Sequence, residues 1–448
     1  MAKPELFDEV VILGMGFVGL TLAAVVAEAG HRVLGVDTNS ETISNLNVGR
    51  ASFYEPNLEI QINNGLTSGN LRFEPILAAS QKKRIFIVSV GTPLKGNQLD
   101  SGAITSIIST LGECIQEGDL VLLRSTIPVG LTRKIKGAIS SKTEKNFLLA
   151  MCPERTLEGS ALEELRVLPQ IVGAPDQISR EAARDFFLTF APKVVQVDSY
   201  EAAELAKLSS NIARDVRFGL ANEIALACER FRINFEDVRI ATIEDYPRDG
   251  LARLGPVAGP CLEKDSWIFL ESLHRFEGDD IEAHLESSII KSARLVNESL
   301  AGWAISNVNH YLTLKGRNTD PVRILHLGMA FKGNPPTNDL RGSDAIKVFN
   351  GLTSNGLNHN YSWDAEVSFE ELNQAGLNPV HKDFSQVDFD IIIVHNNHSL
   401  NKKKVSEYID FKKPGDELYI LDLCNAIEAK KLLPSNVIYR AFGAAQNA

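Results

Sequence analysis

The chain lacks the features that mark several protein classes. It has only five cysteines in 448 residues, an odd number whose spacing fits no metal site. We therefore expect neither a disulfide framework nor a structural zinc site, and we expect a reducing, cytoplasmic location. The formal net charge is -11 and no basic run stands out. Nucleic acid and anionic membrane surfaces are thus not expected as partners.

No segment is expected to be inserted in a membrane. The apolar stretch from Val10 to Ala27 is interrupted by three glycines, and Glu5, Asp8 and Glu9 stand where a signal peptide would carry basic residues. No other stretch is long and apolar enough to span a bilayer. The composition, with 44% hydrophobic and 23% charged residues, is that of a globular protein. The length suits roughly three domains.

Short apolar runs predict two α/β domains, one at each end of the chain. After a first strand from Val10, such runs occupy residues 31–37, 84–90, 120–125 and 147–150. Helix-length segments separate them, as a parallel sheet requires. The same pattern returns in residues 323–328, 390–394 and 418–422. We predict an α/β fold with two Rossmann-like, doubly wound domains.

The middle of the chain has a helical pattern. Between about 200 and 231, apolar residues recur at three- and four-residue steps, which predicts one long amphipathic helix. These residues are Leu205, Leu208, Ile212, Val216, Leu220, Ile224, Cys228 and Phe231. Further helical pattern runs from about 279 to 312. We predict an N-terminal domain over 1–196, a central helical domain over 197–315 whose long helix forms a homodimer interface, and a C-terminal domain over 316–448.

A glycine motif indicates dinucleotide binding. Gly14, Gly16 and Gly19 form G-x-G-x-x-G between a strand and a helix, where backbone amides can face a pyrophosphate. Asp37 ends the second strand at the usual distance. Its carboxylate can accept both ribose hydroxyls and would repel a 2′-phosphate, which favours NAD over NADP. The alternative is that the glycines only allow tight helix–strand packing.

Cys261 is the candidate nucleophile. It follows a segment rich in glycine and proline, residues 255–260, and precedes a helix start at residues 262–265. The helix dipole and Lys264 favour the thiolate, the form that attacks carbonyls. The alternative, a buried apolar cysteine, suits the three cysteines that precede Cys261 better.

Two further pairs could carry chemistry. Lys207 and Asn211 lie four residues apart on the long helix and are expected to project from one face, opposite the apolar stripe. Two such donors suit a developing oxyanion, although a solvated polar face is the alternative. Glu154 and Glu158 follow a strand end, where ligands gather in open sheets. One of them could be a general acid or base, or both could stabilise a helix N-terminus.

Two cations could bind a second diphosphate. Lys332 and Arg341 flank residues 333–340, just after the first strand of the last domain. Ordinary surface charge is the alternative. Tyr311 and Lys315 have the Y-x-x-x-K spacing of short-chain reductases. They lie far beyond the first Rossmann domain, which argues against that class.

The order of the motifs resembles that of the nucleotide-sugar 6-dehydrogenase family, which includes UDP-glucose, GDP-mannose and UDP-N-acetylhexosamine dehydrogenases. The resembling motifs cover nearly the whole chain and lie at residues 14–19, 90–93, 125–130, 153–155, 207–211, 222–223, 261–265 and 330–332. The resemblance implies two oxidations of the sugar C6 by NAD. A thiohemiacetal and then a thioester form on Cys261 before water releases a uronate, used in surface polysaccharide synthesis.

The resemblance also implies roles for individual residues. Lys207 and Asn211 would stabilise the oxyanion, Asp265 and Thr126 would handle water or a proton, and Glu154 and Glu158 would assist. NAD would bind to Gly14, Gly16, Phe17, Val18, Gly19, Asp37, Thr92 and Thr126. The nucleotide sugar would bind to Glu154, Arg155, Lys207, Asn211, Arg248, Lys332 and Arg341.

Some positions depart from the family pattern. Residues 258–260, Ala-Gly-Pro, replace the usual Gly-Gly and one further residue before the cysteine, Glu263 replaces a smaller residue, and Cys424 stands where arginine is usual. The Pro-Glu-Arg at 153–155 and His398 resemble the N-acetylhexosamine branch. They favour UDP-N-acetylmannosamine over UDP-N-acetylglucosamine or UDP-glucose. An inactive NAD- or sugar-binding sensor is the alternative of another class.

Overall fold

The computed structural model describes residues 7–96, 98–246, 250–273, 287–317, 321–381, 383–384, 387–413, 415–427 and 433–444. The chain forms two compact units. The first unit comprises Met1–Ser210 and Trp267–Ile281, and the second unit comprises Asn211–Ser266 and Glu282–Ala448. The boundaries of the three predicted domains stay a prediction.

The first unit is built on an eight-stranded sheet with the order β10-β9-β8-β7-β4-β1-β2-β3. Its strands are β1 (Glu9–Leu13), β2 (Val33–Val36), β3 (Leu71–Glu74), β4 (Arg84–Val88), β7 (Leu120–Leu123), β8 (Leu148–Met151), β9 (Gln170–Gly173) and β10 (Val194–Val197). Neighbours pair in parallel except β8 with β9. Chain order reverses between β1 and β4, the place where open α/β sheets bind ligands.

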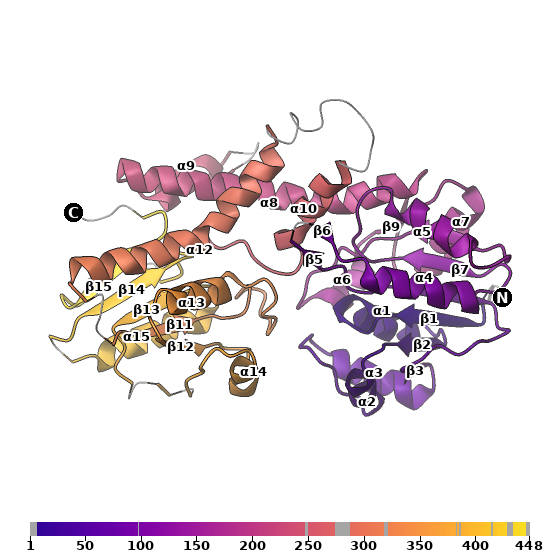
Figure 1. Cartoon of the computed structure of the whole chain (residues 1–448), viewed down its shortest axis with the longest axis horizontal. Helices are drawn as coiled ribbons and strands as arrows, with labels where there is room; N and C mark the ends of the chain where they lie inside the picture. The colour runs from indigo at the N-terminus through magenta and orange to yellow at the C-terminus, as the bar shows by residue number, and fades with distance from the viewer. Residues whose placement is uncertain are drawn as a thin grey trace. The chain divides into compact units, whose positions relative to one another are not determined.

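Helices cover both faces of this sheet (Figure 1). They are α1 (Phe17–Glu28), α2 (Ser40–Asn47), α3 (Leu58–Ser68), α4 (Gly102–Cys114), α5 (Leu131–Ser140), α6 (Ala161–Val167) and α7 (Gln177–Phe187). Helix α1 packs beside α3 and α6, whereas α4 packs beside α5. Because helices lie on both sides, β1, β4 and β7 are buried along their whole length. A short hairpin, β5 (Leu94–Lys95) with β6 (Gln98–Leu99), lies outside the sheet.

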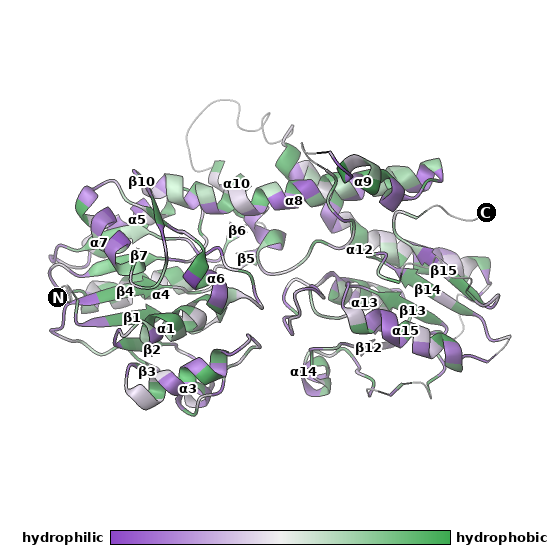
Figure 2. Cartoon of the chain, turned by 180° about the vertical axis from the view of Figure 1, so that it is seen from behind, coloured by the Kyte–Doolittle hydropathy of each residue, from purple (hydrophilic) through white to green (hydrophobic). Residues whose placement is uncertain are grey.

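The second unit holds a five-stranded parallel sheet with the order β12-β11-β13-β14-β15. Its strands are β11 (Arg323–Leu327), β12 (His359–Trp363), β13 (Ile391–Val394), β14 (Leu418–Asp422) and β15 (Val437–Ala441). Alternate residues face opposite layers: Ile391 and Ile393 pack with α12 (Ile289–Leu314) and α13 (Asp344–Ser354), whereas Ile392 and Val394 pack with α15 (Ser399–Phe411). The central strand β13 is hydrophobic along its length (Figure 2). Helix α14 (Phe369–Gln374) follows β12.

A histidine pair lies within this second sheet. His326 on β11 and His395, which follows β13, are both buried, and their rings stack with centroids 5.1 Å apart. His326 Nδ1 lies 2.9 Å from His395 Nε2, and His326 Nε2 lies 3.1 Å from Asn360 Oδ1. Each ring nitrogen of His326 therefore has a partner inside the protein.

The predicted long helix is confirmed as α8 (Tyr200–Phe231) and is followed by α9 (Phe235–Ile243) and α10 (Leu262–Leu273). Helix α8 contributes residues to both units. The alternative of a solvated polar face is wrong for Lys207 and Asn211, which are each 7% exposed. The predicted apolar stripe is divided, since Leu208 is buried whereas Leu220 is 52% exposed. The Asn211 amide has a polar partner inside the protein, described below, that compensates for its burial. Among the described residues, no helix has the length and hydrophobicity to cross a membrane.

Candidate active site

The glycine turn after β1 is closely packed against the end of β4. Gly14 has φ of +98°, and a Cβ atom there would lie 3.0 Å from the Ser89 carbonyl oxygen. A Cβ at Gly19 would lie 1.9 Å from the Gly14 carbonyl oxygen. The serine closes the turn, since its Oγ donates to the Gly14 oxygen over 3.0 Å. Only glycine fits the first and third positions of the motif, because of backbone conformation at one and space at the other.

The N-terminus of α1 can receive an anionic group. Helix α1 begins at Phe17 with no side-chain cap from Gly16 and no acidic residue in its first turn. Gly16 is exposed, and a Cβ there would meet nothing within 4 Å. Phe17 and Val18 are half-buried beside it. Backbone N–H groups and the positive end of the helix dipole therefore face open space, as a pyrophosphate requires.

Asp37 stands beside this turn. Its Oδ2 accepts a hydrogen bond from Met15 N at 2.8 Å, and its Oδ1 accepts one from Asn39 N at 2.9 Å. The carboxylate is half-buried and keeps lone pairs for ribose hydroxyls. Thr92 and Thr126 follow β4 and β7 at the same carboxyl-terminal edge of the sheet. The residues present thus fit NAD at the point where chain order reverses.

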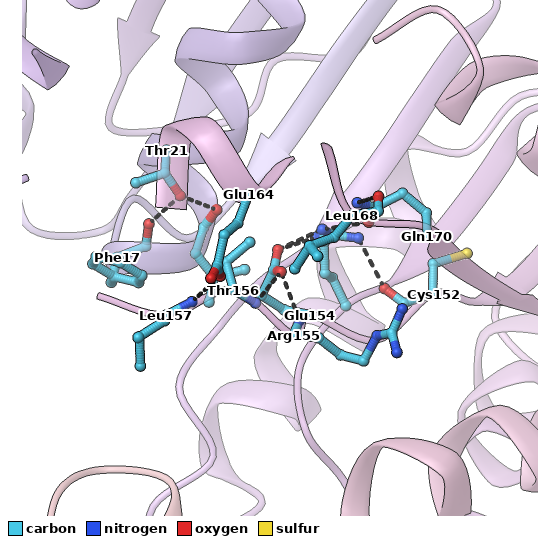
Figure 3. A network of polar contacts seen from close by, with 12 residues as sticks. Phe17, Thr21, Cys152, Glu154, Arg155, Thr156, Leu157, Glu164, Leu168 and Gln170 are labelled. Atoms are coloured by element: carbon cyan, nitrogen blue, oxygen red, sulfur yellow. Dashed lines mark hydrogen bonds and ion pairs between the residues drawn. The ribbon is translucent and has the colours of Figure 1, made fainter. Parts of the chain in front are cut away.

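Glu154 follows β8 and has a full set of partners (Figure 3). Arg124, with a fully buried side chain, donates from Nε to Glu154 Oε2 at 2.9 Å and again from Nη2. Glu154 Oε1 accepts from the backbone N–H groups of Arg155 (2.6 Å) and Thr156 (2.9 Å). Burial raises the pKa of Glu154, but the Arg124 charge and these bonds outweigh it and hold the pKa below its ordinary value. This arrangement favours a positioning carboxylate over the predicted general acid or base.

The loop after Glu154 carries further predicted residues. Arg155 is exposed and donates to the Pro169 carbonyl oxygen, while Glu158 is half-buried. Sequence reasoning missed Glu55, which accepts hydrogen bonds from Gly159 N and Ala161 N, both at 2.7 Å. It is 5% exposed. Glu55 and its partners are more than a hundred residues apart, so no local sequence pattern marks the contact. The acidic residue among apolar neighbours is the one feature of the sequence that points to Glu55.

In the second unit, the structure brings three predicted residues near the start of α10. Cys261 is exposed, and its carbonyl oxygen accepts from Asp265 N at 3.0 Å. Asn211 donates from Nδ2 to Asp265 Oδ2 at 2.6 Å, and Lys264 Nζ bonds the other oxygen at 3.0 Å. Asp265 is 1% exposed. A carboxylate with one amide and one ammonium partner can hold or pass a proton beside the thiol-bearing turn.

The thiols differ sharply in surroundings. Cys114, Cys152 and Cys228 are buried, and burial raises the pKa of each. Burial also raises the pKa of Cys424, which bonds Asp422. Cys261 alone among the five cysteines, all of which lie in the described part of the chain, is exposed. The structure thus favours Cys261 as the reactive thiol.

The turn after the first strand of the second sheet has the same hydrogen bond as the glycine turn after β1. Gly328 follows β11 with φ of +85°, and Ala330 N donates to Asp364 Oδ2 at 2.9 Å, as Met15 N does to Asp37. The Lys332 ammonium lies 5.3 Å from the centre of the Phe331 ring. The predicted Arg341 pairs with Asp339, its Nε donating to the carboxylate at 2.9 Å. His398 caps α15 and lies 3.2 Å from Glu366 Oε1. The predicted substrate residue Arg248 lies outside the described residues.

Comparison with known proteins matches the chain to one family. The model of the NAD-binding domain of the UDP-glucose/GDP-mannose dehydrogenase family matches residues 8–191, and the model of that family's central domain matches residues 201–299. The chain belongs to the UDP-glucose/GDP-mannose dehydrogenase family. The predicted family, α/β fold and NAD cofactor are therefore confirmed.

Relatives of this dehydrogenase family align over most of the chain. The UDP-N-acetyl-D-mannosamine dehydrogenase of Methanococcus vannielii is 28% identical over 91% of this chain and 90% of its own. The NDP-N-acetyl-D-galactosaminuronic acid dehydrogenase of Ralstonia nicotianae is 29% identical over 78% and 81%. The solved UDP-N-acetylmannosamine dehydrogenase structure from Pyrococcus horikoshii has a TM-score of 0.81, with 26% identity over 98% and 99% of the two chains. The protein is an NAD-dependent nucleotide-sugar dehydrogenase.

Proposed function

We propose that this dehydrogenase oxidises the C6 hydroxymethyl group of UDP-N-acetyl-D-mannosamine to the carboxylate of UDP-N-acetyl-D-mannosaminuronate, for surface polysaccharide synthesis. The names of the relatives support the sugar. The observation that carries the four-electron reaction is the single exposed thiol, Cys261, at the start of α10. A two-electron alcohol dehydrogenase needs no nucleophile, whereas acid formation through a thioester does.

The residues divide the work as follows. NAD, held at the glycine turn and Asp37, would supply the hydride acceptor, and a second NAD would replace the first NADH before the second oxidation. After the first oxidation, the Cys261 thiolate adds to the aldehyde carbon, and Lys207 and Asn211 stabilise the resulting oxyanion. The second hydride leaves a thioester on Cys261. Water then attacks the thioester, Asp265 accepts a proton from that water, and the uronate and the thiol are released.

Thr126, Glu154 and Glu158 serve this chemistry from the first unit. Thr126 assists proton transfer, Glu154 holds its own loop in place, and Glu158 assists at the sugar. Arg155, Lys332 and Arg341 bind the nucleotide sugar, as does Arg248. The hydrogen bonds that Glu154 accepts from the backbone N–H groups of Arg155 and Thr156 support this division, because they fix the loop that carries Glu158.

A stoichiometry assay tests the proposal. The protein is incubated with NAD and a panel of UDP- and GDP-sugars that includes the N-acetylmannosamine, N-acetylglucosamine, N-acetylgalactosamine and glucose forms, and NADH is counted per sugar consumed. We expect about two NADH per UDP-N-acetylmannosamine and loss of acid formation in Cys261→Ser. A ratio of one, or unchanged acid formation in that variant, would sink the thioester route. Preference for another sugar would refute the substrate, and no turnover would favour a sensor.

We also propose a homodimer through the central helix. Leu205, Leu220 and Phe231 of α8 are 40%, 52% and 72% exposed, and Leu295 of α12 is 48% exposed. Exposed apolar side chains on neighbouring helices are typical of subunit interfaces. Light scattering should give about twice the 49.1 kDa chain mass. Leu220→Asp should give monomers, and a wild-type monomer would contradict the proposal. The cytoplasmic location stays a prediction.

A further inference from the structure

A network of buried polar side chains holds the segment that carries Cys261. Its members come from three helices: Asp215 and Asn222 from α8, Ser266 from α10, and Arg294 and Asn297 from α12. Each is at most 1% exposed. A buried ion pair is costly unless its geometry is good and its other hydrogen-bonding groups are satisfied. Asp215 and both terminal nitrogens of Arg294 have such partners here.

The Arg294 guanidinium donates hydrogen bonds to the backbone on both sides of Cys261. Its Nη1 donates to the carbonyl oxygen of Leu262 at 2.9 Å, and its Nη2 donates to that of Val257 at 3.2 Å. Leu262 directly follows the cysteine, and Val257 precedes it by four residues. One rigid, planar group therefore fixes the two ends of the turn that presents the thiol.

Asp215 fixes the guanidinium in turn. Its Oδ1 accepts from Arg294 Nη1 at 2.8 Å and from Asn297 Nδ2 at 2.8 Å, while its Oδ2 accepts from Ser266 Oγ at 2.8 Å. Both carboxylate oxygens are thus occupied. Because Ser266 belongs to α10, the same carboxylate links the guanidinium to the helix that begins just after Cys261.

Asn222 holds the start of the segment. It donates from Nδ2 to the Gly255 carbonyl oxygen at 3.0 Å and accepts from Gly255 N at 2.9 Å. Its Nδ2 also bonds Asn297 Oδ1 at 2.9 Å, which joins this contact to the ion pair. The segment is therefore bound to one connected network at Gly255, Val257 and Leu262.

We propose that Arg294, oriented by Asp215, is a positioning residue for Cys261. It keeps the thiol at the N-terminal end of α10, where Lys264 N and Asp265 N bond the cysteine's own carbonyl oxygen. The proposal rests on the proposed function, in which Cys261 is the nucleophile. Misplacement of a reacting atom by about 1 Å can cost about a hundredfold in rate, so a device that fixes this turn has a large effect on catalysis.

Alkylation of Cys261 by iodoacetamide tests the proposal without substrate or NAD. Arg294→Lys keeps a positive charge beside Asp215, but an ammonium cannot reproduce the planar grip on two carbonyls. We expect alkylation at pH 7 to slow at least about fivefold, because the thiol leaves the helix N-terminus. We expect kcat to fall at least about tenfold, with KM for NAD within about twofold of wild type.

Leu352→Ala is the matched control, since it loosens the second unit by removing a fully buried side chain between α13 and the sheet. It should lower the unfolding temperature while leaving alkylation and kcat within about twofold. Asn222→Ala is the second variant should Arg294→Lys fail to fold; it releases Gly255, keeps the ion pair, and should slow alkylation in the same direction.

The proposal would be overturned if Arg294→Lys kept the wild-type alkylation rate and kcat. If Arg294→Lys does not fold, the same result in Asn222→Ala would overturn it. Equal losses of alkylation rate and kcat in Leu352→Ala would also overturn it. Full acid formation by Cys261→Ser would instead refute the proposed function. The alkylation rates would still decide whether Arg294 positions the thiol.

Discussion

Lowering the pH from 7 to 5 should weaken the second sheet through its buried histidines. Burial lowers the pKa of His326 to about 4, and burial together with the neighbouring His326 lowers the pKa of His395 well below its usual value. An unfolded histidine has a pKa of about 6.5. Between these values the unfolded chain binds a proton that the folded chain does not. The contribution of the neutral histidines to the free energy of unfolding is therefore complete above about pH 6.5 and is lost as the pH falls towards the folded-state pKa.

The magnitude follows from the pKa of His326 alone. One unit of pKa difference corresponds to about 1.4 kcal/mol, so His326 should remove about 2 kcal/mol between pH 7 and pH 5 and about 3 kcal/mol by pH 4. His395 contributes with the same sign. Burial raises the pKa of Asp344, Asp364 and Asp422, and these acids act in the opposite direction as the pH falls.

Hydrogen exchange of β11 and β13 peptides, corrected for the intrinsic rate at each pH, measures the effect within the second unit. The comparison is with a His326→Gln/His395→Gln variant, which lacks both titrating groups but keeps the three aspartates. Its opening free energy should be lower at pH 7, and the wild-type advantage over it should shrink by about 2 kcal/mol between pH 7 and pH 5. An equal slope in the two proteins, which leaves that difference constant, would refute the reasoning.

Four substitutions in the first unit have distinct expected outcomes. Asp37→Asn should raise KM for NAD about tenfold and relax the discrimination against NADP, because the carboxylate no longer repels a 2′-phosphate; kcat/KM with each cofactor measures both. Gly19→Ala should abolish NAD binding in calorimetry, since its Cβ would lie 1.9 Å from a backbone oxygen. Gly137→Ala on α5, where a Cβ meets nothing within 4 Å, should stabilise the protein by about 0.5–1 kcal/mol. Glu154→Gln should cost about 3–5 kcal/mol in thermal unfolding by leaving Arg124 buried without its counter-ion, and lost activity at unchanged stability would instead support an acid–base role.

Much of the fold was predictable because parallel strands covered on both faces are hydrophobic throughout. The runs at 84–90, 120–125 and 418–422 contain β4, β7 and β14. The strands that were missed are mainly edge strands: β3 and β10 in the first sheet, and β12 and β15 in the second. Their residues are exposed in part, as in His359–Trp363, so no continuous apolar run marks them.

The candidate site was predictable where a motif is local. Gly14 to Gly19 and Cys261 stand out in sequence because backbone geometry restricts the residue types there. The buried partners of these motifs were not predictable in the same way. Arg124, Glu55 and Arg294 act across 30 to about 100 residues, and an isolated charged residue in sequence normally indicates surface.

The inward polar side of α8 reverses the pattern of tolerance to mutation expected for an amphipathic helix. In a scan of every substitution, Asp215 and Asn222 should be as intolerant as core leucines elsewhere, since any replacement leaves buried partners unsatisfied. Leu205 and Leu220 should accept polar residues as far as folding of the single chain is concerned. Any intolerance at those two leucines would then report on assembly of subunits.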